Sequence, residues 1–143
     1  MEHLAIMRKS WGLTKKILAG EKKIESRWYK SKYPPWNNIK TGEKVYFKDS
    51  GEQVSIKAEV DRVLQFSNLT QERIKEILDK YGEEDGLSIG DIPKFFEMFK
   101  DKKYCILIFL KNPQKIKPFT INKKGFGMMS AWICINDIDS LKK

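Results

Sequence analysis

The chain has 143 residues, long enough for one domain with a modest core and short for two. Its 28 basic and 19 acidic residues give a formal net charge of +9, which favours a polyanionic partner. The sequence has no apolar run long enough to span a membrane, and its first residues, MEHLAIMRKSWG, lack the pattern of a signal peptide. We therefore expect a cytoplasmic protein without a membrane partner.

The charge is distributed unevenly along the chain. Residues 70–101 hold nine acidic and five basic residues, a net charge of −4, whereas the other 111 residues hold 23 basic and 10 acidic residues, a net charge of +13. This contrast predicts that residues 70–101 form an insertion that faces away from an anionic ligand. A basic surface alone is weak evidence, because many lysine-rich proteins bind no nucleic acid.

Apolar spacing in the first half of the chain predicts one short helix among strands. The stretch HLAIM predicts a first strand, and WGLTKKILAG predicts a short helix that ends at Gly20. The stretches KIESRWY and EKVYFKD predict two further strands, since the segment between them contains two prolines and a glycine. Apolar and polar residues then alternate over residues 54–61, which predicts a half-buried strand.

The pattern changes to helical spacing at Thr70, which can cap a helix. Apolar residues then recur in two groups: Ile74, Ile77, Leu78 and Tyr81, followed by Phe95, Phe96, Met98 and Phe99. The stretches YCILIFLKNPQKI and AWICI predict the last two strands. Because strands come first and last with helices between them, we expect an α+β fold with a small β-barrel or curled sheet.

Four residues near the end of the first helix match a known signature. Gly20, Lys22, Glu25 and Arg27 fit the pattern G-x-K-x-x-E-x-R, and in this respect the chain resembles the ASCH domain family of the PUA-like superfamily. The stretches QVSIKAEVDRV and YCILIFLKNPQKI also resemble later strands of this family. The resemblance implies that residues 1–143 are a single PUA-like domain with an N-terminal helix and a two-helix insertion at about 70–101.

The resemblance also implies that a basic cleft beside the motif binds RNA or a nucleotide. Lys22, Glu25 and Arg27 would line it, with Lys23 beside them. In a strand Glu25 and Arg27 project to the same face, where the planar guanidinium suits a phosphate or a base edge and the carboxylate can orient it. The alternative is an exposed ion pair that contributes less than about 1 kcal/mol to stability and has no other role.

Two loops provide further candidates for contact with RNA or a nucleotide. Trp36 follows two prolines and could stack on a base or cover the cleft, whereas we expect Trp28 to pack in the core, because it shares a strand face with Ile24. Lys123 and Lys124 precede a Gly-Phe-Gly sequence, where backbone amides could approach a phosphate.

The sequence leaves open whether the chain is an enzyme. Its one histidine, His3, lies in an apolar strand, the two cysteines lack partners at metal-ligand spacing, and no P-loop occurs, so we expect no cofactor and no metal. Lys22 and Glu25 are the candidate catalytic residues, since a lysine whose pKa is lowered by burial can act as a base.

The superfamily supplies two catalytic alternatives to binding. Some small relatives are amidohydrolases of acetylated cytidine that use a lysine at the position of Lys22, a threonine three residues later and a distant glutamate. Here Glu25 stands at the threonine position, which argues against that activity. Ribonuclease activity has also been associated with the family. An RNA-binding module, a hydrolase of a modified nucleoside or of RNA, and a structural or partner-binding domain therefore remain as hypotheses.

Overall fold

The computed structural model describes residues 1–123, 125–127 and 130–143. Its main elements, in chain order, are β1 (Glu2–Met7), α1 (Leu13–Leu18), β2 (Ile24–Tyr29), β3 (Lys44–Asp49), β4 (Val54–Phe66), α2 (Gln71–Tyr81), α3 (Ile92–Phe99), β5 (Tyr104–Phe119) and β6 (Trp132–Ile135). Short 3₁₀ helices at Lys9–Trp11, Ile89–Asp91 and Ile138–Leu141 complete the described structure. Within these residues no helix is both long enough and apolar enough to cross a membrane.

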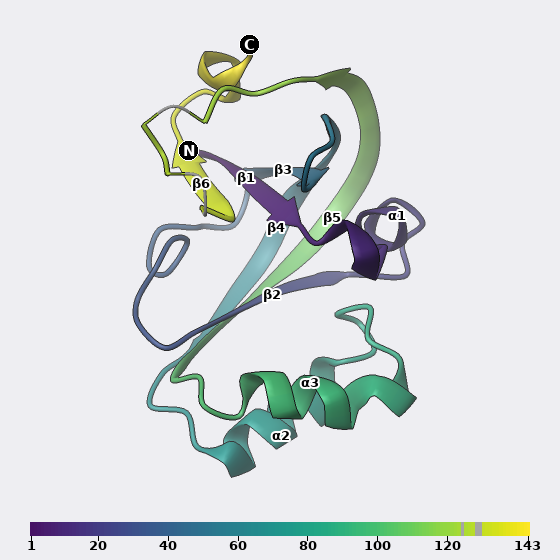
Figure 1. The fold of residues 1–143 in the computed structure, drawn as a ribbon, viewed down its shortest axis with the longest axis vertical. Coiled ribbons are helices and arrows are strands. Elements are labelled where there is room, and N and C mark those ends of the chain that lie inside the picture. Colours follow the sequence, from purple (N-terminus) through teal and green to yellow (C-terminus); the bar gives the residue numbers. More distant parts are fainter. Residues whose placement is uncertain (124, 128–129) are drawn as a thin grey trace.

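The strands form one curled, six-stranded sheet in the order β2-β5-β4-β3-β1-β6 (Figure 1). β1 pairs with β3 in parallel, and the other neighbouring strands are antiparallel. The sheet closes only half a barrel, and three α-helices accompany it, so the predicted α+β class with a PUA-like curled sheet is confirmed.

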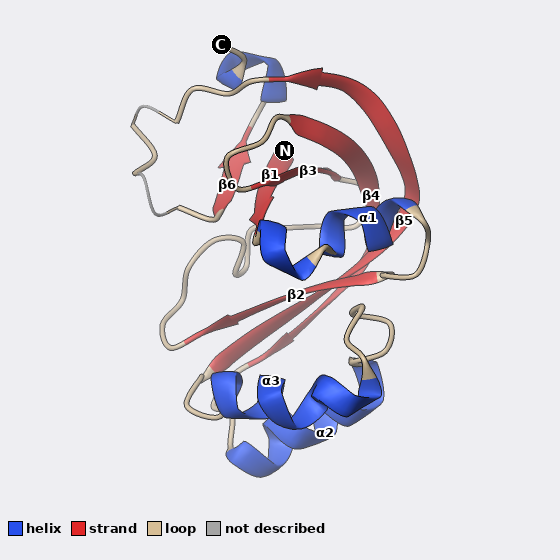
Figure 2. Cartoon of the chain, turned by 45° about the vertical axis from the view of Figure 1, so that its right-hand side comes forward, coloured by secondary structure: helices blue, strands red, loops and turns tan. Residues whose placement is uncertain are grey.

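The two helices predicted within residues 70–101 are present as α2 and α3. The Thr70 hydroxyl accepts a hydrogen bond from the Arg73 amide at 3.2 Å, which caps α2. Both helices lie at one end of the molecule, on the far side of β2 from β1 and β3 (Figure 2). We call residues 70–101 the helical segment.

The first half of β5 is covered on both faces, which explains its continuous apolar run. Ile106 and Ile108 belong to the core inside the curled sheet, whereas Cys105, Leu107 and Phe109 belong to a second core under the helical segment. A strand buried on both faces carries apolar residues at every position.

The neighbouring strand, β2, also lies between these two cores. Its Ile24 and Trp28 pack against the helical segment, and the Trp28 ring stacks on Phe99 with centroids 4.8 Å apart. Tyr29 packs instead against the core inside the curled sheet. The expectation that Trp28 belongs to the core is therefore confirmed, and β2 places the motif residues between two packed layers.

Candidate functional site

A cleft of about 510 Å³ opens between β2, the end of β1 and α3. Its charged lining residues are Arg8, Lys22, Glu25, Arg27, Asp85 and Lys102. Its aromatic lining residues are Trp11, Trp28, Tyr29, Phe95 and Phe99. The cleft therefore combines flat apolar walls with four cations and two carboxylates.

The turn between α1 and β2 places Lys22 at the inner end of this cleft. Gly20 takes a left-handed conformation with φ of 79°, and the amides of Glu21 and Lys22 both donate to the Lys16 carbonyl at 3.0 Å. The next two amides, of Lys23 and Ile24, donate to the Glu84 carbonyl at 2.7 and 3.0 Å. The loop after α2 is thereby attached to the first residues of β2.

Gly86 allows this loop to approach Lys22 closely. It has a φ of 85°, and a Cβ at this position would lie 3.2 to 3.3 Å from three carbons of the Lys22 side chain. A residue with a side chain would therefore meet both backbone strain and crowding here.

The Lys22 ammonium is buried and has a full set of acceptors. Lys22 is 2% exposed, and its Nζ donates to the Ile24 carbonyl at 2.6 Å, the Asp85 carbonyl at 2.6 Å and Asp85 Oδ1 at 2.5 Å. Glu25 Oε1 lies 3.3 Å from the same nitrogen. Since an ammonium has three protons to donate, Lys22 has none left for a ligand.

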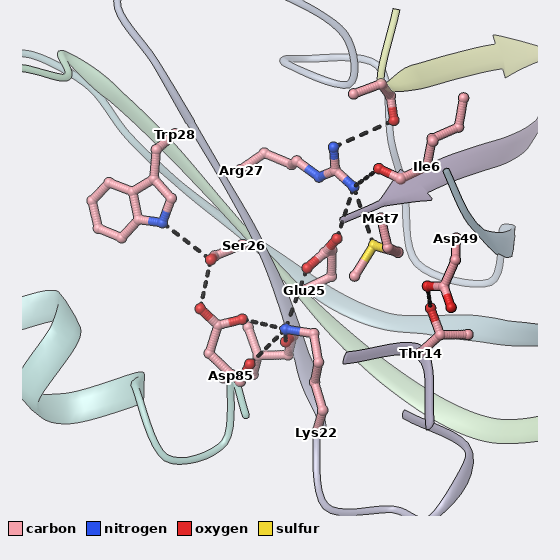
Figure 3. Close-up of polar contacts among 12 residues, drawn as sticks. Ile6, Met7, Thr14, Lys22, Glu25, Ser26, Arg27, Trp28, Asp49 and Asp85 are labelled. Atoms are coloured by element: carbon pink, nitrogen blue, oxygen red, sulfur yellow. Dashed lines mark hydrogen bonds and ion pairs between the residues drawn. The ribbon is translucent and has the colours of Figure 1, made fainter. Parts of the chain in front are cut away.

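Glu25 connects Lys22 to Arg27 (Figure 3). While Oε1 faces Lys22, Oε2 accepts a hydrogen bond from Arg27 Nη2 at 2.8 Å. Arg27 also donates to the carbonyls of Ile6 and Ala131 at 3.4 and 3.3 Å, and its guanidinium lies 5.1 Å from the centre of the Trp132 ring. The Arg27 fork is thus held in one orientation between β1, β2 and β6.

Asp85 completes the group from the helical segment. Its Oδ2 accepts a hydrogen bond from the Ser26 hydroxyl at 2.5 Å, and the Ser26 oxygen in turn accepts from the Trp28 indole at 3.1 Å. Asp85 is 5% exposed. The expectation that the helical segment faces away from the site is therefore wrong: its most buried acid contacts the lysine of the motif, because that lysine needs a carboxylate once it is buried.

The buried charges change one another's pKa values. Burial alone would lower the pKa of Lys22, but the carboxylates of Asp85 and Glu25 outweigh burial and raise it. Burial alone would raise the pKa of Glu25, but Lys22 and Arg27 lower it. Burial, assisted by Glu25, raises the pKa of Asp85 in spite of Lys22.

These shifts bear directly on the candidate catalytic residues. A general base needs a pKa near the working pH, and Lys22 would have to lose a proton that two carboxylates hold in place. The condition under which Lys22 could act as a base, a pKa lowered by burial, is therefore not met. Glu25 is 3% exposed and bridges two cations, which suits it to hold Arg27 rather than to transfer a proton.

Of the other residues expected to contact a ligand, none that the structure describes lines the cleft. Lys23 is exposed and is not among the cleft-lining residues. Trp36 packs edge-on against Tyr104 with ring centroids 5.0 Å apart, and its indole nitrogen is buried without a partner among the described residues. Lys123 donates to the Ser130 carbonyl at 2.9 Å, and Lys124 lies outside the described residues.

A second hollow of about 620 Å³ adjoins the cleft at Tyr29 and Ala131, which line both. Trp132 lines this hollow, is 5% exposed and donates from its indole to Nδ1 of His3 at 3.1 Å. His3 is fully buried and pairs through Nε2 with Glu43, and burial lowers its pKa. His3 therefore has a structural role: it accepts the hydrogen bond of Trp132, the residue whose ring contacts Arg27.

Three charged residues at the cleft were absent from the sequence expectations: Arg8, Asp85 and Lys102. The Lys22–Asp85 contact joins residues 63 positions apart, and no local periodicity connects them. Arg8 directly follows β1, and Lys102 lies between α3 and β5. The sequence predicted these elements correctly, but it did not indicate that the two side chains line the same cleft. In the described part of the chain, no group of three or more His, Cys, Asp or Glu side chains is arranged to hold a metal.

Comparisons with known proteins give a match by structure only, since no family profile and no curated protein matches the sequence. An ASCH protein from Zymomonas mobilis superimposes with a TM-score of 0.68 at 16% identity, covering 97% of this chain and 90% of the other. A mutant form of that protein gives 0.68 at 17% identity and covers 99% of both chains.

A third solved structure is that of a hypothetical protein that covers 79% of this chain and 97% of its own length, at 24% identity and a TM-score of 0.51. The resemblance to ASCH proteins that the motif predicted is thus confirmed in the fold. The chain has the ASCH fold.

Proposed function

We propose that the chain binds RNA or a nucleotide in the cleft beside the G-x-K-x-x-E-x-R motif. The observation that carries the proposal is the orientation of Arg27, whose fork is fixed by Glu25 and by two backbone carbonyls at the wall of a 510 Å³ cleft. A guanidinium held in this way is ready to donate to a base edge or a phosphate without a loss of side-chain entropy.

The walls of the cleft support the same class of ligand. Aromatic side chains bind bases by stacking, at about 1–3 kcal/mol for each stacked base. The cleft has Trp11 and Phe99, both half-buried, on its wall and Met98 beside them, 37% exposed. Its volume is in the range of about 300–1,000 Å³ that small-molecule sites occupy, so it suits one unpaired nucleotide rather than a duplex.

Substitution of Arg27 tests this proposal. Arg27→Ala should weaken binding of a mixed-sequence, single-stranded RNA by roughly 1.5–3 kcal/mol, the range for a charge-assisted hydrogen bond. Arg27→Lys should recover only part of this loss, because an ammonium keeps the charge but not the fork. Fluorescence anisotropy at low salt measures both, at a temperature where circular dichroism shows each variant to be folded.

Lys23→Ala is the matched control for Arg27→Ala. Lys23 lies in the same motif and carries the same charge, but it is exposed and outside the cleft lining. Equal losses in the two variants would mean that binding follows net charge and not the cleft. If Arg27→Ala lowers the melting temperature and leaves affinity intact, the Glu25–Arg27 pair serves only to brace the fold.

One observation keeps hydrolysis of a modified nucleoside as a second candidate. Asp85, a carboxylate distant in sequence, contacts Lys22 in the cleft, and burial raises its pKa, the direction in which catalytic carboxylates are shifted. Turnover of a panel of modified nucleosides, acetylated cytidine included, tests this directly. An enzyme should lose turnover far more than binding in Asp85→Asn and Glu25→Gln, whereas a binding module turns over none of the panel.

A further inference from the structure

Two cations at the cleft differ from the buried ones in having no carboxylate beside them. Arg8 directly follows β1, and Lys102 lies between α3 and β5, so they approach the cleft from different elements. Among the described residues, no carboxylate oxygen lies within ion-pair distance of either side chain. Lys22 and Arg27 are both paired.

This difference decides where the cleft carries unbalanced positive charge. The charges of Lys22 and Arg27 are matched by those of Glu25 and Asp85, and ion pairs link the four groups in one chain from Arg27 to Asp85. The two further cations therefore leave the cleft with a net charge of about +2, located at Arg8 and Lys102. An anionic group would gain more from these side chains than from the motif.

We infer that Arg8 and Lys102 form a subsite for the phosphate group of the bound nucleotide, while Arg27 and the aromatic wall hold its base. This inference rests on the proposed function and adds that different residues bind the phosphate and the base. The phosphate contacts come from residues outside the motif, and the motif supplies orientation.

Arg8 is placed for this role by an aromatic side chain. Its guanidinium lies 4.8 Å from the centre of the Trp11 ring, and Trp11 meets Phe95 edge-on with centroids 5.6 Å apart. An arginine stacked on an aromatic face keeps its N–H groups free at the edge of the plane, where they can bind a phosphate in a bidentate manner. Stacking thus orients the fork without neutralising it.

Lys102 is attached to the other end of the same aromatic row. Its backbone amide donates to the Phe99 carbonyl at 2.9 Å, and Phe99 packs against both Phe95 and Trp28, with centroids 6.1 and 4.8 Å apart. The side chain is half-buried. The aromatic wall on which a base would stack is therefore flanked by two cations that line the same cleft.

The salt dependence of binding tests the subsite. A mixed-sequence, single-stranded RNA is titrated with Arg8→Ala and with Lys102→Ala over a series of salt concentrations. Each lost phosphate contact should lower the slope of log affinity against log salt by about 0.7. Arg27→Ala should weaken binding at every salt concentration and leave the slope close to that of the unaltered chain.

Two neighbouring lysines serve as matched controls. Lys9 follows Arg8 but is paired with Glu52, and Lys103 follows Lys102 but is exposed and lies outside the cleft lining. Lys9→Ala and Lys103→Ala remove the same charge a single residue away. Both should retain the slope of the unaltered chain.

The possible outcomes distinguish failure of the subsite from failure of the proposed function. RNA binding with an unchanged slope in Arg8→Ala and Lys102→Ala overturns the subsite and leaves the proposed function standing. If RNA does not bind, the common ribonucleoside 5′-monophosphates are compared with their nucleosides. A preference for the monophosphates that both variants lose supports the subsite with a free nucleotide as ligand, whereas binding of neither overturns both proposals.

Discussion

The inner cations of the cleft, Lys22 and Arg27, and the outer cations, Arg8 and Lys102, have opposite surroundings, although all four line the same cleft. Lys22 is 2% exposed and has three hydrogen-bond acceptors and a second carboxylate. Arg8 is exposed, and among the described residues its side chain interacts with the Trp11 ring and with no carboxylate. A buried charge must be satisfied inside the protein, and a charge that is already satisfied has little to offer a ligand.

Under the proposed function, a residue of the motif need not touch the ligand. The motif lysine and glutamate hold the site together, and Arg27, at 13% side-chain exposure, stands between the two groups. Substitutions of the inner residues should therefore change stability, whereas substitutions of the outer residues should change affinity.

Removal of the inner ammonium should have the largest effect. Lys22→Met leaves the carboxylates of Glu25 and Asp85 buried without their shared cation, which should lower the free energy of unfolding by about 3–5 kcal/mol. Chemical denaturation measures this. Lys23→Met is the matched control, since Lys23 is exposed, and it should stay within about 0.5 kcal/mol of the unaltered chain. Equal stability of the two variants would show that the buried ammonium of Lys22 does not stabilise the fold.

Glu25→Gln should have the next largest effect and should depend on pH. At neutral pH the variant should be less stable by about 2 kcal/mol, the scale of a charge-assisted hydrogen bond. Because Lys22 and Arg27 lower the pKa of Glu25 below its ordinary value of 4.5 in spite of burial, its contribution is present above pH 4.5 and is lost as the pH falls through the folded value.

The stability curves of the unaltered chain and Glu25→Gln should therefore converge in acid. Urea denaturation over a pH series follows this convergence. Glu21→Gln, at an exposed neighbouring position, should run parallel to the unaltered chain throughout. A constant difference between Glu25→Gln and the unaltered chain down to strongly acidic pH would contradict the account.

A smaller effect is expected where the loop of the helical segment meets Lys22. Gly86→Ala puts a side chain at a φ of 85° and 3.2 Å from the Lys22 Cβ, and should cost about 1–2 kcal/mol of stability. Gly90→Ala is its control, because a Cβ there meets nothing within 4 Å and its φ is not positive. Thermal unfolding compares the two, and a Gly86→Ala variant as stable as Gly90→Ala would show that the loop can withdraw from the lysine.

Motif and strand patterns predicted that Glu25 and Arg27 lie side by side, but not that Lys22 and Glu25 are buried. Alternation along β2 correctly placed Glu25 and Arg27 together, since the two side chains are hydrogen-bonded at 2.8 Å. The alternating pattern of β4 and the helical spacing of α2 also matched the structure, because one face of each is buried.

The partner of Lys22 could not be predicted by the same reasoning. Asp85 stands in the acidic stretch GEEDG, where composition predicts a solvated turn, and only the packing of the helical segment on β2 brings its carboxylate to the lysine. The same packing decides that Trp28 faces Phe99. Contacts between distant segments depend on tertiary packing, of which a single sequence carries no local periodic sign.

The smallest effect is expected at Lys123. Its ammonium donates to the Ser130 carbonyl, and the residue is not among those that line the cleft. Lys123→Ala should therefore leave the salt slope of RNA binding unchanged. A slope lowered by about 0.7 would add this loop to the phosphate contacts and extend the outer group beyond Arg8 and Lys102.

The indole N–H signals of the four tryptophans can test whether the cleft beside the motif holds the ligand. Trp11 and Trp28 line the cleft, whereas Trp36 packs against Tyr104 away from it. In a nuclear magnetic resonance titration with a mixed-sequence, single-stranded RNA, the account predicts that the Trp11 and Trp28 signals move and that the Trp36 signal stays. Movement of Trp36 with Trp11 and Trp28 unchanged, or no movement of any of them at saturating RNA, would contradict it.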